Sequence, residues 1–144
     1  MIEPDTIRLL RECDAGVKMG VESIEEVVDK IKAEDFRQAL VESRHHHDEL
    51  DREIQRQLDR YQDKGKEPNP MARSMSWMKT NAMLMMNHSD RTIADLMTDG
   101  CNMGVKSLHK YLNEYKAADE AAKEITKKLI NLEQKLAVDI RSYL

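Results

Sequence analysis

The chain contains an internal repeat that predicts two copies of the same helix. Residues 16–35 and 100–119 align without a gap, and eight of the twenty aligned positions hold the same residue. Both copies contain Gly-x-x-Met-Gly-Val and both end in Lys-Ala-x-Asp. Apolar residues recur at spacings of three and four, which is the pattern of a helix with one buried face. The repeat therefore predicts two similar helical hairpins.

The first hairpin is expected over residues 5–62. Its first helix runs over about residues 5–32, and Asp5 or Thr6 is its expected N-cap because a short polar side chain can accept from the first free amides. Asp35 is the expected N-cap of the second helix for the same reason.

A crossover helix and a second hairpin are expected to follow. Gly65 is predicted in the turn that ends the second helix, because glycine is common there, and two prolines come after it. A short helix is predicted over residues 71–87, and the second hairpin over residues 90–143. The polar break at residues 88–90 and Asp119 are the expected caps of this hairpin.

This order of elements predicts an all-α fold in a single domain over residues 1–144. Two antiparallel hairpins joined by one long crossover give a ferritin-like four-helix bundle, here with a short extra helix in the crossover. Glycine inside a helix costs about 1 kcal/mol relative to alanine, so glycines at matching positions of the repeat predict close packing of the two repeated helices. These helix-packing glycines are Gly16, Gly20, Gly100 and Gly104.

Several short motifs resemble those of a known family. They are Glu12-Cys13-x-x-Gly16, the Gly65-x-x-Pro68 turn, Trp77-x-Lys79 in the predicted crossover helix, and Gly100. With these motifs the chain resembles a bacterial group of ferritin-like four-helix-bundle proteins that is classified as a domain of unknown function. The resemblance implies the fold, and it implies no activity.

Composition narrows the classes of partner. The 23 basic and 27 acidic residues give a net charge of −4 and are interleaved along the chain, so no basic block predicts binding to nucleic acid. No apolar run approaches the roughly 18 residues that would span a membrane, and the acidic N-terminus does not match a signal peptide. We therefore expect a cytoplasmic protein in which Cys13 and Cys101 are buried, reduced thiols.

A di-iron centre is the first site to test in such a bundle. It requires a Glu from each of two helices and Glu-x-x-His from each of the other two. Glu42 and His45 match that spacing, but Glu133 is followed three residues later by Leu136. The apolar faces of the repeated helices carry no carboxylate at mid-core in this interpretation. We expect a dry interior without converging acids, no catalytic residue and no cofactor, with iron as the alternative.

The histidine tract offers a weaker metal site. Consecutive helical residues point about 100° apart, so only Glu42, His45, His46 and Glu49 remain as candidate ligands, on the surface. His47 lies on the apolar face, where we expect it to bond a backbone carbonyl or a side-chain partner. Burial should lower the pKa of His47, which makes it a candidate pH sensor.

Methionines dominate one face of the predicted crossover helix. Thioethers can bind Cu(I), but methionine is more often a flexible filler of apolar contacts. A face of this kind can also repack against different partners. The residues of this predicted partner face, called the Met face below, are Met71, Met75, Met78 and Met85.

The leading interpretation is a non-catalytic bundle. No nucleophile motif, phosphate-binding loop or dinucleotide fingerprint is present in the sequence. We expect a role in protein interaction or as an accessory or stress-type module, with an unknown protein partner and a homodimer as the expected assembly. The alternative is a metal-binding protein or oxidase that uses a di-iron or surface His/Glu site.

Overall fold

The computed structural model describes residues 4–68 and 89–144, and in these ranges the chain is helical apart from turns and contains no strand. The predicted crossover helix and its Met face lie outside the described residues. The elements are α1 (Pro4–Val27), the 3₁₀ turn η1 (Val28–Lys30), α2 (Glu34–Arg60), α4 (Asp90–Glu114), α5 (Glu120–Asp139) and the 3₁₀ turn η2 (Arg141–Tyr143).

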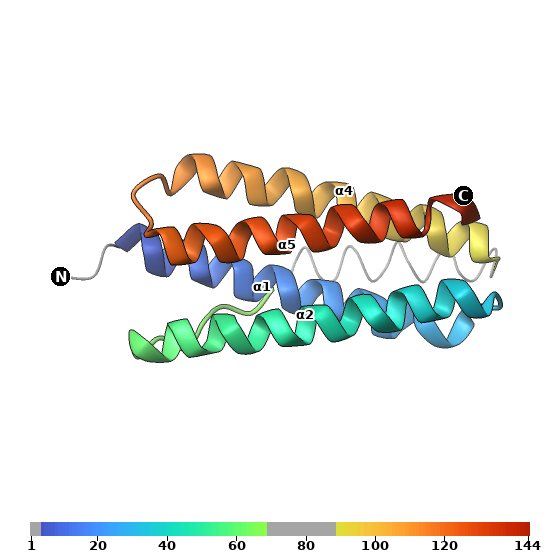
Figure 1. Cartoon of the computed structure of the whole chain (residues 1–144), viewed down its shortest axis with the longest axis horizontal. Coiled ribbons are helices and arrows are strands. Elements are labelled where there is room, and N and C mark those ends of the chain that lie inside the picture. The colour runs from blue at the N-terminus through green and yellow to red at the C-terminus, as the bar shows by residue number, and fades with distance from the viewer. Residues whose placement is uncertain (1–3, 69–88) are drawn as a thin grey trace.

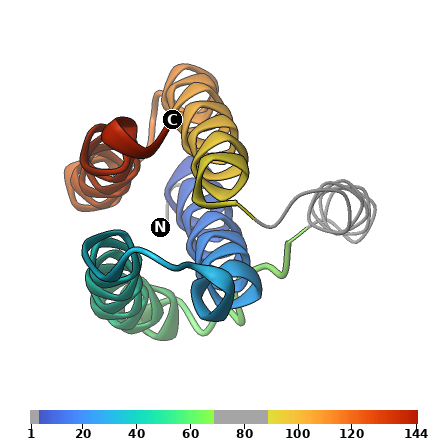
Figure 2. The same ribbon diagram turned by 90° about the vertical axis from the view of Figure 1, so that its right-hand side faces the viewer.

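The four long helices pack lengthwise into a bundle (Figure 1). α1 and α5 run in one direction, and α2 and α4 run in the other. α1 packs against α2, α4 and α5, and α2 also packs against α5. α2 and α4 occupy opposite corners, as Figure 2 shows in the end-on view. Because α2 and α4 run the same way, α4 begins at the end of the bundle opposite to the end of α2.

The apolar interior is divided into two clusters, one toward each end of the bundle. Both are built from the predicted apolar faces, which are buried because removing aliphatic side chains from water is favourable. The first cluster includes Leu9, Leu10, Val17, Ile54, Leu58, Ile125 and Leu129. The second includes Ile24, Ile31, Phe36, Leu40, Ile93, Leu136 and Ile140.

Asp5 and Thr6, the predicted caps of α1, form hydrogen bonds with the turn of the second hairpin. α1 begins at Pro4, one residue earlier than expected. The Asp5 carboxylate accepts from the backbone N–H of Ala117 at 3.2 Å, and Thr6 Oγ1 accepts from that of Asp119 at 2.9 Å. These two side chains therefore hold the α4–α5 turn against the start of α1.

Asp35 is not the N-cap of α2, so that prediction is wrong. α2 begins at Glu34, its N-cap is Ala33, and no side chain caps it, because Asp35 already lies in the first turn. The Asp90 carboxylate instead accepts from the backbone N–H groups of Lys32 and Ala33, both at 2.9 Å. The start of α4 is thereby tied to the α1–α2 turn.

The second hairpin uses its predicted caps. Ser89 Oγ accepts from the backbone N–H of Thr92 at 3.2 Å, and Asp119 Oδ1 accepts from that of Ala122 at 2.8 Å. Each bond satisfies one of the amides that a helix start leaves without a partner.

Gln62, not Gly65, closes α2. Gln62 has a positive φ of 54°, and its N–H donates to the carbonyl of Asp59 while that of Asp63 donates to Leu58, both at 3.0 Å. This is the Schellman arrangement, which satisfies the last carbonyls of a helix. Gly65 has a φ of 80°, and it lies further along, where the chain turns back over α1.

None of the described helices combines the length and the apolar character that crossing a membrane would require.

Replacing Asp119 with Ala should lower the free energy of unfolding by about 1 kcal/mol, because α5 loses its capping bond. Urea denaturation followed by circular dichroism measures this change. The matched control is Asp35→Ala, which removes an acidic residue from a first turn where it caps nothing, and should cost only about 0.3 kcal/mol of dipole interaction. Equal losses in the two variants would contradict the assignment.

Candidate functional site

A polar contact joins the two hairpins between the apolar clusters. His47 of α2 and Glu133 of α5 meet with Nε2 and Oε1 2.7 Å apart. His47 is 0% exposed and Glu133 is 9% exposed. This contact is called the central pair below.

The hydrogen-bond partners of His47 restrict where the protons of its ring lie. Its Nδ1 lies 2.7 Å from the backbone carbonyl oxygen of Ser43. A carbonyl only accepts, so Nδ1 carries a hydrogen, and the contact of Nε2 with the Glu133 carboxyl group requires a second proton. The raised pKa of His47 favours that proton on the ring, which gives an imidazolium bonded to the Glu133 carboxylate.

The pKa of His47 shifts in the direction opposite to the predicted one. Burial does lower the pKa, and it is the largest single effect, but the hydrogen bond to Glu133, the charge of Glu133 and the Ser43 carbonyl together outweigh it and raise the pKa above 6.5. The expectation from burial alone fails because the charged ring has a buried carboxylate as its partner.

Both cysteines are buried and free, as expected. The Cys101 thiol of α4 forms a hydrogen bond with Glu133. Burial, together with the Glu133 carboxylate, raises the pKa of the Cys101 thiol. Cys13 Sγ lies 3.2 Å from Thr126 Oγ1, and burial raises its pKa to about 12. Both groups therefore remain protonated thiols at neutral pH, and neither has the thiolate that a nucleophile needs.

Of the repeated glycines, Gly20 makes room for a side chain, whereas a Cβ on Gly16 or Gly104 would lie at ordinary contact distance from one. A Cβ on Gly20 would lie 3.0 Å from His47 Nε2, and one on Gly104 would lie 3.6 Å from Glu133 Oε2. A Cβ on Gly16 would meet Leu129 at 3.5 Å. The expected close approach of α1 and α4 is therefore not what these glycines provide, because their neighbours come from α2 and α5.

Gly100 differs from its repeat partner Gly16. A Cβ on Gly100 would meet nothing within 4 Å, since this residue is exposed on α4. The repeat thus matches in sequence, but the two glycines lie in different surroundings.

The expectation of a dry, apolar interior is wrong. Asp14 of α1 is buried and Glu133 of α5 nearly so. A signal for both was present in the spacing: Asp14 lies four residues after Leu10, and Glu133 lies four residues after Leu129, so each fills a gap in an apolar face. An acid at such a position lies on the same helix face as the apolar residues and therefore faces the core of the bundle.

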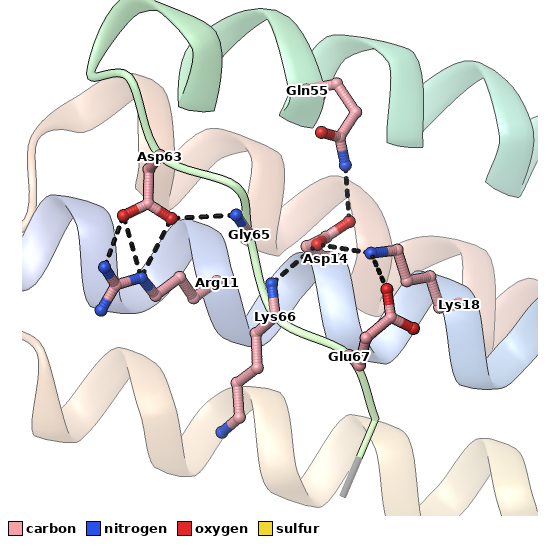
Figure 3. Close-up of polar contacts among 8 residues, drawn as sticks. All are labelled: Arg11, Asp14, Lys18, Gln55, Asp63, Gly65, Lys66 and Glu67. Atoms are coloured by element: carbon pink, nitrogen blue, oxygen red, sulfur yellow. Dashed lines mark hydrogen bonds and ion pairs between the residues drawn. The ribbon is translucent and has the colours of Figure 1, made fainter.

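Asp14 is the centre of a second polar cluster, between α1, α2 and the chain that leaves α2 (Figure 3). Its carboxylate accepts from Gln55 Nε2 at 2.7 Å, from Lys18 Nζ at 3.0 Å and from the backbone N–H of Lys66 at 2.9 Å. Any Cβ on Gly65 would collide with this carboxylate. Glycine is therefore needed at position 65 for a close approach as well as for its positive φ.

Residues 63–67, called the clasp below, are fastened along α1. Arg11 Nε donates to the two carboxylate oxygens of Asp63 at 3.0 and 3.2 Å, and the Arg11 hydrogen bond holds the pKa of Asp63 below its ordinary value. Lys18 donates to Glu67 at 2.9 Å. The crossover therefore begins from a defined position on the bundle.

The predicted surface ligands are only partly brought together. His45 Nε2 and Glu49 Oε1 lie 2.8 Å apart in an exposed pair, while Glu42 is exposed elsewhere on the helix. His46 and Glu49 line a shallow groove between α2 and α5. Across residues 4–68 and 89–144, no group of three or more His, Cys, Asp and Glu side chains is placed to hold a metal ion.

Comparisons with known proteins found no match among protein-family models, curated proteins or solved structures.

The two kinds of glycine give a matched test. Gly20→Ala should lower the free energy of unfolding by about 1–2 kcal/mol, because the new Cβ presses on an imidazole held at both nitrogens and overpacking outweighs the gain in helix propensity. Gly100→Ala should instead raise it by about 0.5–1 kcal/mol, since its Cβ meets open space. Thermal and urea unfolding of both variants measure the difference, and stabilisation by Gly20→Ala would show that the central pair is not tightly held.

Proposed function

We propose that this chain is a non-catalytic bundle of ferritin-like topology that acts in the cytoplasm by binding other proteins, as an accessory or stress-type module. The observation that carries this proposal is the closure of the central pair. His47, Glu133 and Cys101 are buried and bonded to one another or to the backbone. Groups that already satisfy each other away from solvent offer a substrate neither access nor an open coordination position.

The direction of the helices supports the ferritin-like part of the proposal. α1 runs one way, α2 and α4 run the other way, and α5 returns to the first direction (Figure 1). A connection along the bundle between the second and third long helices is the feature that defines that topology.

The residues around the central pair argue against the oxidase alternative. A di-iron site needs carboxylates from all four helices. At the level of the central pair, α1 contributes Gly20 and α4 contributes Gly104 and Cys101, and the nearest neighbours of the glycines are His47 and Glu133. α1 and α4, which would have to supply further carboxylates, therefore contribute glycines and a thiol at this level.

Metal content and oxygen chemistry test the non-catalytic part. Protein purified without chelators should contain no stoichiometric metal by mass spectrometry, and anaerobic loading with Fe²⁺ followed by oxygen should give no ferroxidase absorbance above the buffer rate. The control is Glu133→Gln, which keeps the size of the side chain. Stoichiometric iron that the wild type binds and this folded variant loses would overturn the proposal.

We assign self-association to the Met face, because methionine side chains adapt to an opposing surface. Light scattering coupled to size exclusion should give twice the chain mass of 16.7 kDa for the wild type. Replacing Met71, Met75, Met78 and Met85 together with Ser should give the mass of one chain while helicity is retained.

Met103→Ser is the matched control for that experiment. Met103 lies on α4 and is 69% exposed, so its loss removes an equally apolar surface residue from outside the Met face. This variant should remain a dimer. A wild type that stays at the mass of one chain at high concentration, or a dimer that survives the fourfold replacement, would contradict the assignment.

A further inference from the structure

Two carboxyl groups lie in contact between α1 and α2, beside the clasp. Asp51 of α2 lies within hydrogen-bonding contact of Asp14 of α1. Asp51 Oδ1 is buried and finds no hydrogen-bond donor among the described residues. Two carboxylate oxygens are both acceptors, so they form a hydrogen bond only when one of them carries a proton.

The surroundings of Asp14 indicate which group holds that proton. Asp14 already accepts from Gln55, Lys18 and the backbone N–H of Lys66. The Asp14 oxygens are thus acceptors in three hydrogen bonds, whereas Asp51 Oδ1 has no donor among the described residues, so the proton is placed on Asp51, which then donates to Asp14.

The charges that face the pair do not balance two anions. Among the described residues, Lys18 of α1 is the cation that acts on Asp51, and it also binds Glu67 of the clasp at 2.9 Å. Gln55 contributes a neutral amide from α2, and the Cys13 thiol beside Asp14 stays protonated because its pKa is raised. A second carboxylate charge at this position would therefore be compensated only in part.

We propose that the contact between Asp14 and Asp51 is a proton-operated latch that holds α2 against α1 beside the clasp. With the proton in place, Asp51 donates to Asp14 and the contact is closed. When the proton leaves, two carboxylates repel each other in a largely buried site, and Asp51, which is only partly buried, turns toward water. Water then reaches Asp14 and the backbone N–H of Lys66.

The latch responds near neutral pH. Burial, followed by the hydrogen bond and the charge of Asp14, raises the pKa of Asp51 to about 6, and Gln55 and Lys18 offset this only in part. In the unfolded chain an Asp has a pKa of about 3.9. Between these values the folded protein holds more protons than the unfolded chain, so its stability falls as the pH rises through this window. The latch is closed below pH 6 and loosens above it.

NMR measures the two consequences in the intact protein. The side-chain carboxyl ¹³C signal of Asp51 should titrate near pH 6. Hydrogen exchange at the backbone N–H of Lys66, after correction for the intrinsic pH dependence of exchange, should lose protection by about tenfold between pH 5 and pH 8, which corresponds to about one pKa unit of coupling.

Asp51→Asn is the informative variant, because a neutral amide can donate to Asp14 at every pH. Its protection at Lys66 should be high and independent of pH. The control is Glu53→Gln, which removes a carboxylate of the same helix that pairs with Lys128 and should leave the wild-type pH dependence intact. An Asp51 signal that titrates near 4 in the wild type, or the same loss of protection in Asp51→Asn, overturns the latch.

Discussion

The buried contact between His47 and Glu133 is the interaction on which the rest of the bundle depends. It connects α2 to α5, and so one hairpin to the other, and it separates the interior into two apolar clusters. A Cβ at position 20 would press on the His47 ring, and one at position 104 would meet Glu133 at ordinary contact distance. Sliding one hairpin along the other by a helical turn would separate the two side chains and break this pairing. We infer that the central pair sets the register of the hairpins, a role for which buried polar groups have precedent.

Each of two interior contacts in this bundle depends on a proton that its two side chains share. In the central pair the proton lies between an imidazole and a carboxylate, and beside the clasp it lies between Asp51 and Asp14. The pKa of His47 and that of Asp51 are both raised, so both contacts favour the protonated form and both weaken as the pH rises. Protonation of these interior groups thus changes the stability of the bundle, which agrees with a function carried out at the surface.

The long helices and their buried faces follow from the sequence, because the spacing of apolar residues is a local property. Ser89 and Asp119 could be predicted as caps for the same reason. Asp35 was assigned wrongly, because α2 begins at Glu34 and no side chain caps it. The turn before α2 is held instead by Asp90, which is 57 and 58 positions away from the residues that it binds. The direction of the His47 pKa shift depends likewise on Glu133, 86 positions away. Asp14 and Glu133 were detectable as gaps in apolar faces, but their partners are defined only once the helices pack.

Nitrogen-15 NMR of the His47 side chain across a pH titration tests the central claim most directly, because the two ring nitrogens report protonation separately. If His47 is an imidazolium bonded to Glu133 and Ser43, its pKa is raised, and most rings carry protons on both nitrogens at pH 6.5, the ordinary midpoint for histidine. A ring that has one bare nitrogen in most molecules at pH 6.5, or a nitrogen signal shifted by a bound metal, would contradict a closed and non-catalytic centre.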